Sequence, residues 1–162
     1  MTNLKNVSAV NKDEAKFLFR FTQFVEWPPT AFSSANSPLV IGVLGGNPFG
    51  DELEKAVQGQ RINGHPVVVR RMTPISDLKQ CHVLFINRGI RSRLPLIFDS
   101  LGNGHTLTVS DADNFLAAGG AINFFTVENK VRFEINRAAA EKAGLKMNSQ
   151  LLMMAKRPPV GQ

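Results

Sequence analysis

The fold is decided by residues 39–46, which read Leu-Val-Ile-Gly-Val-Leu-Gly-Gly. A continuous apolar run with β-branched members, closed by a pair of glycines, is typical of a strand that is buried on both faces. Such strands occur at the centre of parallel sheets, where helices cover both sides. We therefore expect residues 39–44 to form a central strand of a parallel sheet.

Helical and extended segments alternate along the chain after this strand. Helices are predicted over residues 52–58, 76–80 and 91–101, and extended segments over residues 66–70, 83–86 and 106–110. This alternation is typical of a doubly wound α/β sheet. We expect a flavodoxin-like or Rossmann-like, mostly parallel sheet with flanking helices.

A further helix is predicted before the central strand. Residues 11–14, Asn-Lys-Asp-Glu, have the spacing of a helix cap with acidic residues in the first turn, and apolar side chains then recur at helical intervals over residues 17–25. Pro28 and Pro29 cannot continue a helix, so we expect it to end at Trp27, whose ring should pack structurally.

The last third of the chain departs from the parallel pattern. The extended segments 121–127 and 131–135 are separated by three residues, which is too short for a parallel crossover, so they should form an antiparallel hairpin. A two-residue turn at Glu128 and Asn129 would place Val127 opposite Lys130.

Two short helices are expected after the hairpin. Asn136 can cap a helix that runs to Ala143, and Gly144 can supply its left-handed end. Ser149 is expected to cap a final helix before the prolines at 158 and 159. We assign residues 1–10 to a flexible segment, residues 11–157 to a single domain and residues 158–162 to a tail.

The predicted hairpin register separates two faces. One face is apolar, and the other carries Asn123, Phe125, Arg132 and Glu134. A ring beside a guanidinium, and an amide beside a carboxylate, is a composition typical of a protein-binding surface, with Phe125 as its anchor. The alternative is a solvated face whose charges discourage edge-to-edge aggregation.

A second candidate site lies where parallel strands end. A glycine-rich loop follows the central strand, and Ser110 and Asp111 follow a later strand, so both should meet at the carboxyl edge of the sheet. Free amides there could hold an anionic metabolite through Gly45, Gly46, Asn47, Gly50, Ser110 and Asp111. The loop lacks a dinucleotide fingerprint and a P-loop ending, so a tight strand-to-helix turn is the alternative.

The charge distribution, the single cysteine and the spacing of the histidines argue against several classes of function. Nineteen Lys and Arg against thirteen Asp and Glu give a formal charge of +6, but the cations are scattered, which argues against nucleic acid as a partner. Cys81 is the only cysteine, so no internal disulfide can form. His65, His82 and His105 lack metal-ligand spacing, and no nucleophile motif is present, so we expect neither an enzyme nor a metal or cofactor site.

Membrane insertion is not expected. No window reaches the roughly 18 apolar residues of a membrane span, and residues 1–13 lack the apolar stretch of a signal peptide. The sequence as given therefore carries no visible export signal.

Several motifs together resemble the YfiR-like family. They run in order over residues 15–155: AKFLFRF at 15–21, FVEWP at 24–28, IGVLG at 41–45, PFG at 48–50, CHVLFI at 81–86, LTVSD at 107–111, GGAINF at 119–124, VRFEIN at 131–136, AGLK at 143–146 and SQLL at 149–152. The FVEWP and RFEIN segments are the most specific of these. YfiR itself carries paired cysteines that tie repression to oxidation, whereas this chain has Cys81 alone.

This resemblance implies an exported, periplasmic α/β protein, often a homodimer. It implies repression of an inner-membrane diguanylate cyclase by binding to its periplasmic sensor region, so that release of the repressor raises cyclic di-GMP and favours biofilm. With that partner, Asn123, Phe125, Arg132 and Glu134 are the expected contact residues. A sensor of an anionic small molecule at the strand carboxyl ends is the alternative function.

Overall fold

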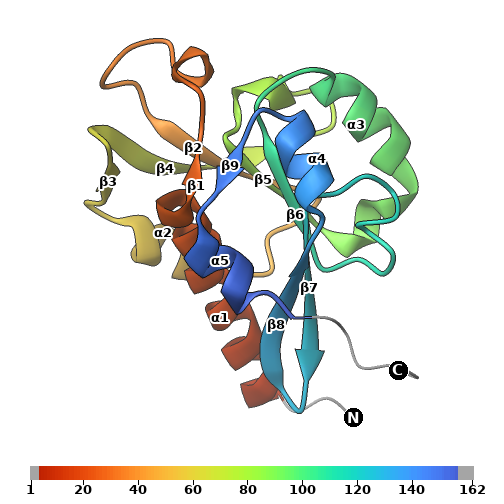
Figure 1. Cartoon of the computed structure of the whole chain (residues 1–162). Helices are drawn as coiled ribbons and strands as arrows, with labels where there is room; N and C mark the ends of the chain where they lie inside the picture. The colour runs from red at the N-terminus through yellow and green to blue at the C-terminus, as the bar shows by residue number, and fades with distance from the viewer. Residues whose placement is uncertain (1–3, 157–162) are drawn as a thin grey trace.

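The computed structural model describes residues 4–156, with only the backbone of residues 4–8, as a mixed α/β structure (Figure 1). Its helices are α1 (Leu4–Phe24), α2 (Glu52–Val57), α3 (Leu94–Leu101), α4 (Arg137–Lys142) and α5 (Ser149–Met154). Its strands are β1 (Val25–Glu26), β2 (Leu39–Leu44), β3 (Arg61–Ile62), β4 (His65–Met72), β5 (Val83–Ile86), β6 (Leu107–Ser110), β7 (Ile122–Val127), β8 (Lys130–Ile135) and β9 (Lys146–Met147). Short 3₁₀ helices are η1 (Pro29–Ala31), η2 (Leu78–Gln80) and η3 (Arg88–Arg93).

A seven-stranded mixed sheet has the order β3-β4-β2-β5-β6-β7-β8. Strands β4, β2, β5, β6 and β7 run parallel, and β3 and β8 pair antiparallel at the two edges. All six residues of β2 are buried, as predicted for a central strand. Because β2 has neighbours on both edges and covered faces, its side chains never meet solvent on either side.

Two hydrophobic cores cover the opposite faces of the sheet. The alternating side chains Leu39, Ile41 and Val43 of β2 join the core beneath α1, α2 and α5. Val40 and Leu44 join the other core, which lies beneath α3 and η2. The period-two alternation of the strand therefore places apolar side chains in both cores.

Helix α1 is longer at its start than expected and shorter at its end. It begins at Leu4 rather than Asn11, so residues 11–14 lie within the helix and do not cap it. It ends at Phe24, before Trp27, because Val25 and Glu26 pair with β9 as a two-stranded antiparallel sheet. The predicted tail, residues 158–162, lies outside the described residues.

The remaining helices differ from prediction mainly in type and in caps. Residues 76–80 form only the 3₁₀ turn η2, and residues 91–101 are divided between η3 and α3. Asn136 caps α4 as predicted, and Gly144 has a left-handed φ of 80°. The last cap is Asn148, whose side chain accepts a bond from the Gln150 amide, and Ser149 is already helical.

The hairpin register is confirmed at every pair, from Ile122 opposite Ile135 to Val127 opposite Lys130. Its two turn residues, Glu128 and Asn129, have φ values of 52° and 65°. Positive φ at both central positions is the type I′ geometry that matches the twist of the flanking strands.

Three short strands were not predicted. Strands β1 and β9 pair with each other although most of the chain lies between them in sequence. Each has only two residues, which is too short to show the periodicity of a strand. Strand β3 pairs with the start of β4 around Asn63 and Gly64. That Asn-Gly dipeptide is a strong hairpin signal, and it could have identified β3 from the sequence. Between residues 4 and 156, no helix is both long and apolar enough to span a bilayer.

Candidate functional site

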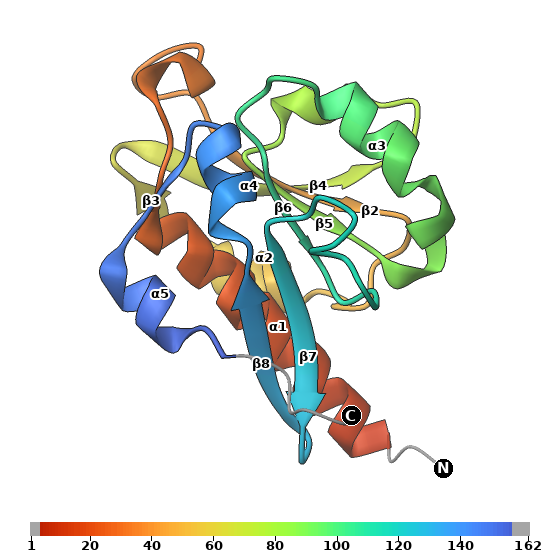
Figure 2. The ribbon, with the colours of Figure 1, turned by 45° about the vertical axis from the view of Figure 1, so that its right-hand side comes forward.

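The C-terminal hairpin projects beyond the rest of the sheet. Strand β6 pairs with β7 only at Ile122 and Asn123, so from Phe124 onward β7 and β8 form a two-stranded arm. This arm lies alongside α1 in two views of the molecule (Figures 1 and 2). On the face of the arm that does not pack against α1, Phe125, Val127 and Arg132 are half-buried and Lys130 is exposed.

The inner face of the arm is held by a cluster of phenylalanine rings. Phe133 lies 5.3 Å from Phe17 and 5.2 Å from Phe21, between ring centroids, with both pairs edge-to-face. Phe124 stacks on Phe21 at 5.8 Å. Ring pairs of this geometry contribute about 0.5–1.5 kcal/mol each beyond burial of area. The arm is thus fixed to α1 and not left as a free hairpin.

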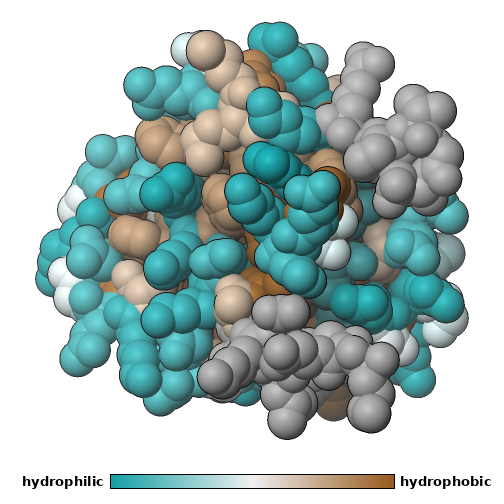
Figure 3. Space-filling view, turned by 90° about the horizontal axis from the view of Figure 1, so that it is seen from below, coloured by the Kyte–Doolittle hydropathy of each residue, from teal (hydrophilic) through white to brown (hydrophobic). Residues whose placement is uncertain are grey.

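The outer face carries Phe125, Arg132 and Glu134, which we call the hairpin patch. Phe125 lies directly opposite Arg132 in the register, and Glu134 lies two residues further along β8 on the same face. All three side chains are half-buried, so each has part of its surface exposed to solvent. Seen from the hairpin end, the surface is mostly hydrophilic with small hydrophobic areas between polar side chains (Figure 3).

Asn123 does not belong to this exposed surface. It was predicted to contact a partner, but its side chain is only 7% exposed. The reason is its place in the sheet: Asn123 still has Ser110 of β6 beside it, whereas Phe125 lies beyond the end of β6. Its Oδ1 atom has no hydrogen-bond partner among the described residues.

The residues predicted to form a site at the carboxyl edge of the sheet lie in the loop after β2 and at the end of β6. Gly45, Gly46 and Gly50 are exposed after β2. The Asn47 side chain is already used within the loop, because its amide nitrogen donates to Gly50 O at 2.7 Å and its oxygen accepts from the Phe49 amide at 3.2 Å. Asn47 therefore shapes the strand-to-helix turn.

Ser110 and Asp111 have different surroundings. Ser110 is fully buried, and its hydroxyl donates to Ile86 O at 2.6 Å and accepts from the Ala112 amide. Asp111 is partly exposed and forms an ion pair with Arg88 at 3.2 Å. Ser110 thus bridges β5 and β6 structurally, and Asp111 remains as the polar group that a ligand could reach.

A buried carboxyl group that no sequence motif identified lies near this edge. Glu14 on α1 is 4% exposed, and its Oε1 atom has no hydrogen-bond partner among the described residues. The pKa of Glu14 is raised to about 8, chiefly by burial and then by the nearby Asp111 carboxylate, while Arg88 acts in the opposite direction. Glu14 lies one helical turn before the buried Leu18, and this spacing could have indicated from the sequence that Glu14 faces the core.

Cys81 and His82 are buried and contribute to packing and hydrogen bonding within the fold. Cys81 is buried, and this burial raises the pKa of its thiol to about 12. His82 Nδ1 accepts a bond from the Val40 amide, so its Nε2 donates to Ala31 O at 2.8 Å. Burial lowers the pKa of His82, consistent with a neutral ring. Across the described part of the chain, no three His, Cys, Asp or Glu side chains gather as a metal site would require.

Comparison with known families agrees with the motifs in the sequence. A family model described as YfiR/HmsC-like matches residues 11–156, which is most of the chain. The match confirms the resemblance drawn from the sequence motifs, and it includes the whole hairpin arm. A search of curated proteins finds no match.

Proposed function

Because this chain belongs to the YfiR/HmsC-like family, we propose that it is a periplasmic negative regulator of an inner-membrane diguanylate cyclase. It binds the sensor region of the cyclase and so lowers cyclic di-GMP and biofilm formation. Members of the family act as regulators and not as enzymes, and the proposed activity needs no reaction at the site.

The observation that carries this proposal is the half-buried hairpin patch on a rigid arm. A contact surface is most useful when its side chains are held in place before binding, because less conformational entropy is then lost on association. The four-ring cluster on the inner face holds the arm against α1. The outer face can therefore meet a partner without refolding.

The chemistry of the patch also suits protein contact. Interface energy concentrates in a few aromatic and arginine side chains near the centre, surrounded by residues that exclude water. Phe125 supplies the apolar ring, Arg132 lies opposite it, and Glu134 adds a carboxylate that can select a partner cation. We expect Phe125 to contribute most to affinity, and the two charges to contribute mainly to specificity.

The test is binding of the purified protein to the isolated sensor region of the membrane cyclase encoded in the same genome. Phe125→Ala should weaken binding at least about tenfold, as expected for loss of a central aromatic anchor. Glu134→Ala should weaken it less. Leu96→Ala is the matched apolar control, since Leu96 on α3 is 69% exposed and lies away from the hairpin.

Glu141→Ala is the carboxylate control, because Glu141 forms only an exposed ion pair with Arg137. Both controls should bind as the unchanged protein does. If Phe125→Ala and Glu134→Ala bind normally while remaining folded, the hairpin patch is not the contact surface. If no binding occurs with any variant or with the unchanged protein, the cyclase is not the partner.

We do not extend the proposal to an anionic-metabolite sensor at the carboxyl edge. Asp111 and the buried Glu14 place two carboxyl groups near this edge, with Arg88 as the one cation paired to Asp111. A negative ligand would be repelled by ionised Asp111 and would have to compete for Arg88. The exposed glycines alone do not offset this charge.

We also propose two further features that the family resemblance implies, a flavodoxin-like arrangement of strands and a homodimer. Numbered by their order in the chain, the five parallel strands lie in the order 2-1-3-4-5, which supports a flavodoxin-like arrangement. The connection between β6 and β7 contains turns in place of a helix, which is a departure from that pattern. We also propose a homodimer, and light scattering of the purified chain would measure its mass.

A further inference from the structure

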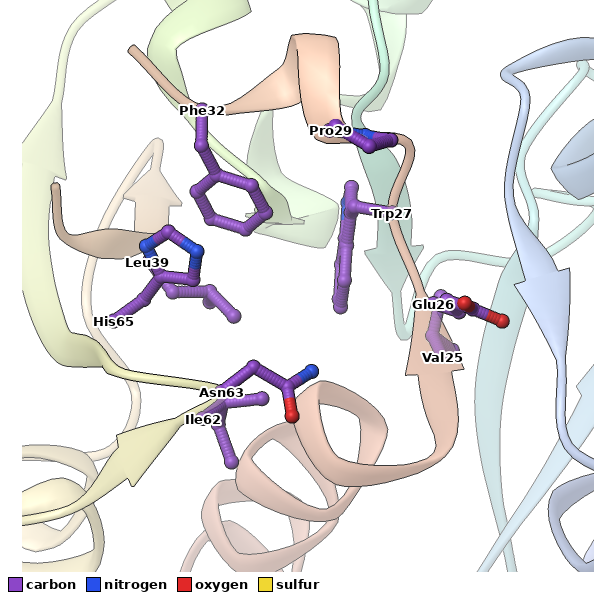
Figure 4. Close-up of a pocket in the computed structure, with 9 residues that line it drawn as sticks. All are labelled: Val25, Glu26, Trp27, Pro29, Phe32, Leu39, Ile62, Asn63 and His65. Carbon is purple, nitrogen blue, oxygen red and sulfur yellow. The ribbon is translucent and has the colours of Figure 1, made fainter. Parts of the chain in front are cut away.

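A small pocket lies at the opposite end of the sheet from the hairpin arm. It encloses about 230 Å³, which is smaller than the roughly 300–1,000 Å³ of drug-sized sites. It is formed where α1 ends, where β2 and β4 begin, and at the β3–β4 turn. Figure 4 draws its lining: Val25, Glu26, Trp27, Pro29, Phe32, Leu39, Ile62, Asn63 and His65.

The aromatic walls of this pocket are held in place. The Trp27 indole donates from Nε1 to His82 O at 3.2 Å, and Trp27 is only 8% exposed. Phe32 is stacked on His65 at 3.7 Å and on His82 at 4.4 Å, between ring centroids. In Figure 4 the Trp27 ring is seen edge-on, so that one of its faces is turned to the space bordered by Phe32 and His65.

The polar groups that border this space are acceptors or neutral. His65 Nδ1 lies 2.6 Å from Ser37 O, and a carbonyl oxygen can only accept, so the proton is on Nδ1. In the neutral ring, Nε2 then presents a lone pair. The Asn63 amide also points toward the space, from a turn position with a left-handed φ of 52°.

Glu26 is the only acidic residue among the lining residues of the pocket. The nine lining residues include no Lys or Arg, although the chain carries nineteen of them. Glu26 is exposed at the rim, and its carboxylate is directed to the far side of Trp27 in Figure 4. Lys146 lies opposite Glu26 in the β1–β9 pair, so we assign Glu26 only a small part in binding.

We propose that the pocket formed by Trp27, Phe32 and His65 binds a small quaternary ammonium compound. Aromatic faces carry negative quadrupole charge and attract ammonium groups, with Trp the most effective ring. Acceptors such as His65 Nε2 can receive a hydrogen bond from a ligand hydroxyl such as that of choline, and none of the nine lining residues is itself a cation. The aliphatic floor of Val25, Leu39 and Ile62 suits the methyl groups of such a ligand.

Trp27 itself provides the assay, since it is the only Trp in the chain and there is no Tyr. Choline is titrated against the full chain, and the emission of Trp27 is followed alongside calorimetry. The uncharged control is 3,3-dimethylbutan-1-ol, which has the shape of choline without its charge. Choline should give a saturable change and bind about tenfold more tightly than the alcohol.

Phe32→Leu should weaken choline binding about tenfold, because the Phe32 ring, stacked between His65 and His82, holds the His65 wall of the pocket in place. Phe98→Leu is the matched control, as Phe98 is a half-buried ring in the core beneath α3, on the other face of the sheet. Circular dichroism would verify that both variants fold.

Three results would overturn the proposal: no saturable binding of choline or tetramethylammonium by either method, equal affinity for the alcohol, or unchanged binding by folded Phe32→Leu. The choline and alcohol comparison needs no variant, so it remains decisive even if Phe32→Leu does not fold. Binding to the cyclase sensor region is measured separately, so failure of one proposal does not decide the other.

Discussion

Replacing Glu14 with Gln should make the protein more stable at neutral pH. The Glu14 carboxyl is buried on α1, and its burial, together with Asp111, raises its pKa from 4.5 to about 8. Between these two values the folded state holds a proton that the unfolded state releases. The unfolded state then binds fewer protons, so the free energy of unfolding falls as pH rises through this range.

The magnitude follows from the two pKa values. One pKa unit corresponds to about 1.4 kcal/mol, and about 2.5 units lie between 4.5 and neutral pH, so the penalty is about 3 kcal/mol near pH 7. Near pH 5 it is below about 1 kcal/mol. Gln has nearly the shape of protonated Glu and does not titrate. Glu14→Gln should therefore gain up to about 3 kcal/mol over the unchanged protein at neutral pH and little near pH 5.

Urea unfolding at a series of pH values, followed by circular dichroism, would measure this difference. Glu141→Gln is the control for loss of a carboxylate at an exposed site. The quantity that matters is the difference in unfolding free energy between Glu14→Gln and the unchanged protein, plotted against pH. A difference that stays constant between about pH 5 and pH 8 would mean that Glu14 is ionised and solvated in the folded protein, which would contradict this prediction.

Three further predictions concern stability and reactivity. Cys81, which is 1% exposed with a pKa raised to about 12, should not react with a thiol-specific disulfide reagent until urea unfolds the chain; rapid reaction of the folded protein would contradict its burial. Gly42→Ala should destabilise the fold by about 1–3 kcal/mol in a urea titration, because a Cβ there would collide with Cys81 Sγ and lie 2.9 Å from Met72 Cγ; an unchanged midpoint would show that this core can relax. Glu128→Asn should stabilise by about 0.5–1 kcal/mol in thermal unfolding, since Asn tolerates the left-handed φ of 52° better than Glu, and a lower melting temperature would argue against the turn geometry.

The hairpin was predictable because its rules are local. A strand has a period of two, and a two-residue turn sets the register, so the pairing of Phe125 with Arg132 follows from the sequence alone. The membership of the patch was only partly predictable. Asn123 shares a face with Phe125, but its exposure depends on where β6 ends, and that is set by a strand from another part of the chain.

The pocket beside Trp27 was also only partly predictable from the sequence. Trp27 was expected to pack structurally, and it is buried and hydrogen-bonded. That its ring also faces Phe32 and His65 depends on the bend after α1 and on the β3–β4 turn. No periodicity connects positions 27, 32 and 65, so no pattern in the sequence could have brought them together.

The amino-acid sequence was enough to predict the buried central strand, the alternation of strands and helices, the hairpin with its register, and the family. These depend on apolar periodicity, turn chemistry and short motifs, which act over a few neighbouring residues. Three features depend on the folded chain: α1 gives way to a strand paired with β9, Glu14 is buried near Asp111, and Asn123 is covered while Phe125 is not. Burial and electrostatic environment are sums over segments distant in the chain, and packing alone brings those segments together.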